Sequence, residues 1–111
     1  MLNLAVLVSG GGTNLQAIID GIERGAVKDA AVRLVISNNP GAYALERAKK
    51  HGIEAVCISP KDFSGRDAFY EAMIAKLQEA GTDLVVLAGY LVVISPAMVR
   101  AFENRIINIH P

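Results

Sequence analysis

A net charge, a long apolar run and a pair of cysteines are all missing from this sequence, and each absence excludes a class of protein. Eleven Lys and Arg balance eleven Asp and Glu, and the longest basic run is the pair Lys49-Lys50. A nucleic-acid-binding surface needs clustered positive charge, so we expect no nucleic-acid partner. The longest apolar run, Leu84 to Ile94, is well short of the roughly 18 residues of a membrane helix. We therefore expect no membrane partner, a cytoplasmic location and a small ligand.

The single cysteine, Cys57, cannot form an internal disulfide. It lies in the apolar run Ala55 to Ile58, which predicts a buried thiol. Aromatic residues make up 5% of the chain against 52% hydrophobic residues, which indicates a core built by aliphatic side chains. A chain of 111 residues is long enough for one core, so we expect a single domain over residues 1–111.

Apolar runs typical of strands alternate with segments of helical period. From Leu15, apolar residues recur at i, i+3, i+4 and i+7, the spacing of one helix face. Strands that are apolar throughout, each followed by a helix, predict a parallel sheet covered on both faces, which is a doubly wound, Rossmann-like α/β fold. The expected strands are residues 3–8, 31–36, 54–58, 83–88 and 105–109, and the expected helices are residues 15–24, 43–51, 67–80 and 96–103.

Capping residues predict where the helices begin. Thr13 and Gln16 have the spacing of a capping box at the start of the first helix. Ser64 is placed to cap the third helix, and Ser95, followed by Pro96, is placed to cap the fourth. Glycines after the second and third helical segments predict their ends.

The loop from Ser9 to Asn14 joins the first expected strand to the first expected helix and contains three consecutive glycines. Glycine permits positive φ and close approach to an anion, and the free N–H groups of a first helical turn add donors and partial positive charge. We therefore predict a phosphate cradle in which Gly12, Thr13 and Asn14 donate hydrogen bonds. A purely structural tight turn is the alternative.

Two common nucleotide-binding motifs do not match this loop. The third glycine of the dinucleotide fingerprint is replaced by Leu15, and the second strand runs into Ser37 and Asn38 rather than ending in an acidic residue, which argues against NAD. No lysine follows the glycines, which excludes the P-loop of nucleoside triphosphate enzymes. A phosphomonoester is the remaining ligand.

Asn108 and His110 stand two residues apart at the end of the last expected strand, so they share one face of it. A histidine there can transfer protons near neutral pH, and a carboxamide can donate to a carbonyl that gains negative charge. The pair suits acyl transfer. An amide and an imidazole that merely end a strand are the alternative.

Taken together, these motifs resemble the N-terminal half of the phosphoribosylglycinamide formyltransferases. That family transfers a formyl group from 10-formyltetrahydrofolate to glycinamide ribonucleotide in de novo purine (IMP) biosynthesis. The resemblance covers the whole chain and rests on four motifs: residues 9–16, 36–38, 83–90 and 108–111.

The resemblance implies roles for individual residues and no metal. Gly12, Thr13 and Asn14 match the loop that holds the ribonucleotide phosphate. Asn108 and His110 match the catalytic pair that polarises the formyl carbonyl and assists proton transfer. The implied folate-binding residues are Arg66, Leu91, Val92, Val93, Ile94 and Asn108.

The chain departs from the family pattern in two places. Leu91 and Val92 stand where a methionine and a basic residue are expected, and the family continues beyond the position of Pro111 to a catalytic aspartate. We therefore expect an incomplete fragment with little activity alone and an apolar sheet edge prone to self-association. A phosphate-binding module without catalysis, or another folate-dependent formyl transferase or hydrolase, remains the alternative.

Overall fold

Strands and helices alternate along residues 1–109, the part of the chain that the computed structural model describes. The elements are β1 (Leu2–Val8), α1 (Thr13–Glu23), β2 (Ala30–Ser37), α2 (Tyr43–Lys50), β3 (Glu54–Cys57), the short 3-10 helix η1 (Pro60–Asp62), α3 (Arg66–Glu79), β4 (Leu84–Ala88), α4 (Pro96–Ala101) and β5 (Ile106–Ile109).

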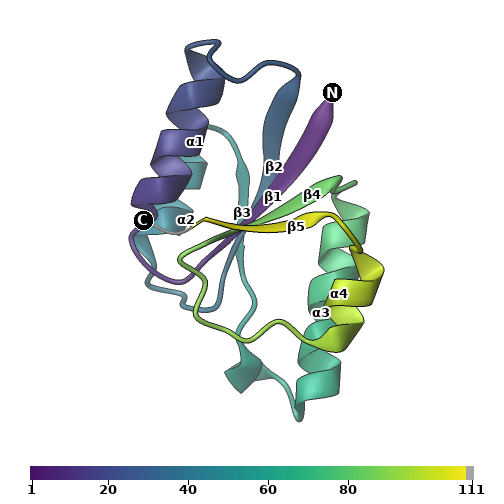
Figure 1. Ribbon diagram of the computed structural model, residues 1–111. Coiled ribbons are helices and arrows are strands. Elements are labelled where there is room, and N and C mark those ends of the chain that lie inside the picture. Colours follow the sequence, from purple (N-terminus) through teal and green to yellow (C-terminus); the bar gives the residue numbers. More distant parts are fainter. Residues whose placement is uncertain (110–111) are drawn as a thin grey trace.

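The five strands form one parallel sheet in the order β3-β2-β1-β4-β5. Helices α1 and α2 cover one face and α3 and α4 the other (Figure 1). The side chains of successive β1 residues point to opposite faces of the sheet. Leu7 packs with Phe69 and Met73 of α3, whereas Val6 packs with Leu15 of α1. Both faces of the central strands are therefore buried, which confirms the predicted doubly wound α/β fold.

The strands and helices begin and end within about two residues of the predicted bounds, but two of the predicted caps are wrong. Gly12, with φ 81°, precedes the first residue of α1, and no side chain caps this helix, so Thr13 and Gln16 form no capping box. Gly65 rather than Ser64 precedes α3, again without a side-chain cap. Ser95 is confirmed as a cap, because its Oγ accepts a hydrogen bond of 3.2 Å from the Met98 N–H.

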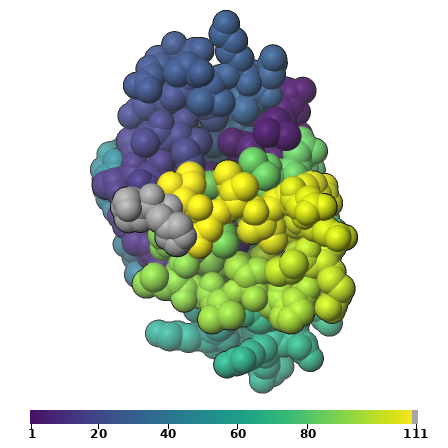
Figure 2. Space-filling model, in the orientation of Figure 1, coloured from purple at the N-terminus to yellow at the C-terminus, as the bar shows by residue number. Residues whose placement is uncertain are grey.

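The two outer strands are less buried than the inner ones. Cys57 in β3 is half-buried rather than buried, because a strand at the edge of the sheet is covered on fewer sides. β5 forms the opposite edge of the sheet, and the yellow C-terminal part of the described chain crosses the middle of the face in Figure 2. Ile107 of β5 is 47% exposed. Within residues 1–109, no helix is long and apolar enough to cross a membrane.

Candidate functional site

The strand order changes direction beside β1, and this places three loops together at the carboxyl edge of the sheet. β1 pairs with β2 on one side and with β4 on the other. The chain after β1 leads to α1 on one face, and the chain after β4 leads to α4 on the other, so the two loops part from a common point. The Ser9 N–H donates to the Gly89 carbonyl across it at 3.2 Å. Ligands of open α/β sheets bind at such a switch point.

The hydroxyl of Ser9 links the loops that follow β1, β2 and β4. It donates to Asn38 Oδ1 at 2.6 Å and accepts from the Leu91 N–H at 2.8 Å. Ser9 is 8% exposed, so these bonds are largely protected from competing water. The glycine-loop pattern includes Ser9 but does not predict this role, because its partners are distant in the chain.

A polar hollow of about 170 Å³ lies at this point. All three predicted phosphate-binding residues line it, together with Val8, Gly10, Gly11, Ala88 and Gly89. Gly12 is buried, and a Cβ atom there would lie 2.8 Å from the Cβ of Ala44. The N–H groups of the first turn of α1 have no carbonyl four residues earlier in the helix, so this hollow borders a set of available donors.

The segment from Gly89 to Ile94, which contains four of the predicted folate-binding residues, runs from this hollow toward α4. Leu91 and Val93 are 83% and 78% exposed, whereas Val92 and Ile94 are half-buried against the core on the α3 and α4 face. The Tyr70 hydroxyl of α3 donates to the Val93 carbonyl, which ties the segment to that helix. The segment therefore presents apolar side chains to solvent from an anchored backbone.

Arg66 is the first residue of α3 and is exposed. It precedes Tyr70 by four residues, so the two side chains lie on neighbouring positions of one helix face. Since Tyr70 contacts the backbone of Val93, Arg66 lies on the face of α3 that meets the predicted folate segment.

Asn108 is exposed in β5, where it pairs with Leu87 of β4, two residues before Gly89. It alternates with Ile109 and shares a strand face with Ile106, which packs against the core on the α3 and α4 side. Asn108 is thus near the carboxyl edge and on the same side as the Gly89–Ile94 segment. The predicted partner, His110, lies outside the described residues.

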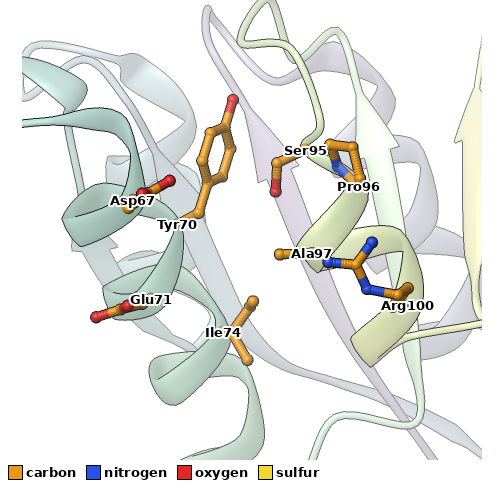
Figure 3. Close-up of a pocket in the computed structure, with 8 residues that line it drawn as sticks. All are labelled: Asp67, Tyr70, Glu71, Ile74, Ser95, Pro96, Ala97 and Arg100. Atoms are coloured by element: carbon orange, nitrogen blue, oxygen red, sulfur yellow. The ribbon is translucent and has the colours of Figure 1, made fainter.

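A second hollow, of about 300 Å³, opens between α3 and α4. Figure 3 shows Asp67, Glu71 and Tyr70 of α3 on one wall and Arg100 of α4 on the other. None of the predicted site residues lines it. Within residues 1–109 there is also no group of three or more His, Cys, Asp or Glu that could hold a metal ion.

The comparison with known families establishes the class of this protein. The sequence pattern of the formyl transferase family, described as "Formyl transferase", matches residues 2–111. The chain therefore belongs to the formyl transferase family.

Individual relatives show which members of the formyl transferase family this chain resembles. The chain is 41% identical to phosphoribosylglycinamide formyltransferase of Escherichia coli over 110 residues, which are 99% of this chain and 51% of that protein. It is 45% identical to the trifunctional purine biosynthetic protein adenosine-3 of Drosophila melanogaster over 97% of this chain and 8% of that one. The crystal structure of glycinamide ribonucleotide transformylase 1 from Symbiobacterium toebii superposes with a TM-score of 0.94 at 47% identity, covering 100% of this chain and 52% of that one.

These relatives confirm the predicted resemblance and set its extent. The chain spans about half the length of the Escherichia coli and Symbiobacterium toebii proteins, and its fold is that of the matching half.

Proposed function

We propose that this chain is the substrate-anchoring half of a phosphoribosylglycinamide formyltransferase, in which the hollow bordered by Gly12, Thr13 and Asn14 binds the phosphate of glycinamide ribonucleotide. The observation that carries the proposal is the polar hollow at the switch point, which borders the N-terminal turn of α1 and backbone of the glycine loop. Backbone donors with the helix dipole behind them suit a phosphate dianion.

The same proposal assigns the formyl donor, 10-formyltetrahydrofolate, to the Gly89–Ile94 segment. Exposed Leu91 and Val93 offer apolar surface for a flat ring system, and Arg66, on the adjoining face of α3, offers a positive charge for a carboxylate. The residues present therefore fit a molecule with an aromatic ring at one end and a carboxylate at the other. Asn108 lies on this side of the sheet, on the strand that pairs with β4, from whose end the segment starts.

The chemistry of the proposed transfer balances without a redox agent or a metal. The folate supplies the formyl group, the glycinamide amine nitrogen forms a bond to its carbon, and the bond from that carbon to the folate nitrogen breaks. The Asn108 carboxamide would donate to the carbonyl oxygen as it gains negative charge. His110 would accept the proton that the amine loses and return one to the folate nitrogen.

We further propose that the 111-residue chain binds ligand weakly and turns over little by itself, that it acts in the cytoplasm, and that the exposed edge at β5 associates with another chain. The position of Ile107 at this edge supports the last point. Sedimentation over a range of concentrations tests it, and a monomer at the highest concentration would contradict it.

A titration of the ¹⁵N-labelled chain tests the phosphate site. We expect glycinamide ribonucleotide to shift the amide resonances of Gly11 to Asn14, and the dephosphorylated riboside, as the matched control ligand, to leave them unchanged. Equal effects of the two ligands, or no binding of either, would overturn the proposed site.

The competing function, a phosphate-binding module without catalysis, is separated by a second assay. The chain is mixed with the C-terminal half of the Escherichia coli relative, and formyl transfer is measured. We expect transfer, lowered by about 100-fold or more in Asn108→Ala, since one oxyanion donor contributes that much. Absence of transfer, or transfer that is indifferent to Asn108→Ala, would favour the module.

A further inference from the structure

Helix α2 lies directly behind the glycine loop and accounts for the direction of two of its peptide groups. The Ala44 N–H donates to the Gly10 carbonyl at 3.4 Å, and Arg47 Nε donates to the Gly11 carbonyl at 2.7 Å. The packing is close, since a Cβ atom on Gly12 would lie 3.4 Å from Arg47 Cδ and closer still to Ala44. Both loop carbonyls therefore point toward α2.

The direction of these carbonyls determines where the neighbouring N–H groups point. The described residues contain no cis peptide bond, and in a trans peptide group the carbonyl and the following N–H point in opposite directions. The N–H groups of Gly11 and Gly12 are therefore turned away from α2. The hollow of about 170 Å³ is lined by the loop and by the ends of β1 and β4, and by no residue of α2.

These two N–H groups are available to a ligand. Among residues 1–109, no backbone or side-chain group accepts a hydrogen bond from Gly11 N–H or Gly12 N–H. An anion in the hollow would supply the missing acceptor. The position of the Gly11 carbonyl is thus coupled, through one rigid peptide plane, to the donor that Gly12 presents.

Arg47 is itself held by a network between α1 and α2. Its Nη1 donates to Gln16 Oε1 at 3.2 Å, and its guanidinium lies 4.9 Å from the centre of the Tyr43 ring. The Gln16 carboxamide nitrogen lies 3.3 Å from His51 Nε2, and His51 Nδ1 lies 2.6 Å from Glu23 Oε2. These contacts form a continuous chain from Glu23 through His51, Gln16 and Arg47 to the Gly11 carbonyl.

We infer that Arg47 is a positioning residue for the anion cradle: it holds the Gly11 carbonyl against α2 and so directs the Gly12 N–H into the hollow. The inference rests on the proposed phosphate site. Arg47 does not line the hollow, so it acts through the loop and not as a ligand of the phosphate. A carbonyl that accepts from a guanidinium is held more strongly than one that accepts from a neutral donor.

The experiment measures affinity for ribose 5-phosphate and inorganic phosphate by NMR titration of the 111-residue chain. Arg47→Met keeps the length of the side chain and removes its donors, and we expect a loss of roughly tenfold or more in affinity. Lys49→Met on the same helix is the matched control: Lys49 is exposed, its charge loss is equal, and its ion pair with Glu46 is 3.7 Å long. We expect Lys49→Met to change affinity by about twofold at most.

Further measurements distinguish a positioning role of Arg47 from an effect of its positive charge. Arg47→Lys retains the charge but not the rigid Nε donor, so we expect it to recover only part of the affinity. Without any ligand, the Gly12 amide resonance should move in Arg47→Met and stay in place in Lys49→Met. If Arg47→Met does not fold, Gln16→Leu, which removes the acceptor of Nη1, should weaken binding by roughly threefold.

The outcomes are distinguishable. If the unchanged chain binds neither probe, the proposed phosphate site fails. If it binds and Arg47→Met binds equally well, or Arg47→Lys restores full affinity with an unmoved Gly12 resonance, the positioning role of Arg47 is overturned while the site stands.

Discussion

Replacement of Gly12 by alanine should destabilise the chain more than replacement of any neighbouring glycine. Gly12 has φ 81°, and a Cβ atom there would lie 2.8 Å from Ala44 Cβ and 3.0 Å from Ala44 Cα. Ala44 belongs to α2, and its Cα is backbone that cannot rotate away. The substitution therefore introduces both backbone strain and a collision with a neighbouring helix.

The two effects can be given magnitudes. An L-residue in the left-handed region costs about 1–2 kcal/mol, and crowding a packed site costs about 1–3 kcal/mol more. We expect Gly12→Ala to lower the free energy of unfolding by roughly 2–5 kcal/mol, a large part of the ~5–15 kcal/mol of a typical domain. The outward movement of the loop from α2 should also weaken phosphate binding.

Two glycines of the same chain are matched controls. Gly25 also has φ 81°, but a Cβ atom there would have no neighbour within 4 Å, so Gly25→Ala reports strain alone, about 1–2 kcal/mol. Gly11 has neither a positive φ nor a neighbour within 4 Å, and Gly11→Ala should be neutral or stabilise by about 0.4–1 kcal/mol.

Urea unfolding at 25 °C, followed by far-ultraviolet circular dichroism at fixed protein concentration, measures all three variants. If Gly12→Ala is no less stable than Gly25→Ala, the close packing of α2 against the loop is refuted. If it equals Gly11→Ala, the left-handed conformation is refuted as well.

Three further predictions use the same unfolding assay or thiol labelling. Ser9→Ala leaves the Asn38 side chain and the Leu91 N–H without their partner and should lower the free energy of unfolding by about 1–3 kcal/mol. The control Ser64→Ala removes no helix cap and should change the free energy of unfolding by less than about 0.5 kcal/mol. The Tyr90 hydroxyl is buried without a hydrogen-bond partner among residues 1–109, so Tyr90→Phe should raise the free energy of unfolding by about 1 kcal/mol. A decrease of similar size in the free energy of unfolding would contradict this. Burial, and secondarily the charge of Asp62, raises the pKa of the Cys57 thiol. Iodoacetamide at pH 8 should therefore label Cys57 more slowly than it labels a free-cysteine peptide, and Asp62→Asn should speed the labelling. Equal labelling rates for chain and peptide would refute the raised pKa.

Local patterns in the sequence were enough to predict the fold class and the location of the candidate site. Short apolar runs such as residues 84–88 are typical of strands buried on both faces of a parallel sheet, and the helical period from Leu15 is a local property of the chain. Ser95 followed by Pro96 predicted a real helix start, because the capping hydroxyl and the N–H group that donates to it lie within three residues of each other. The glycine loop after β1 was found in the same way.

How that loop is held depends on tertiary contacts that no local pattern predicts. The partners of Ser9 lie 29 and 82 residues away, and Arg47 lies 36 residues from the carbonyl that it contacts. Gly12 rather than Thr13 precedes α1 because the loop passes against α2 with a positive φ, and no local spacing predicts that neighbour. Contacts across the carboxyl edge depend on the strand order, so the sequence could locate the donors of the proposed cradle but not the distant residues that contact its loop.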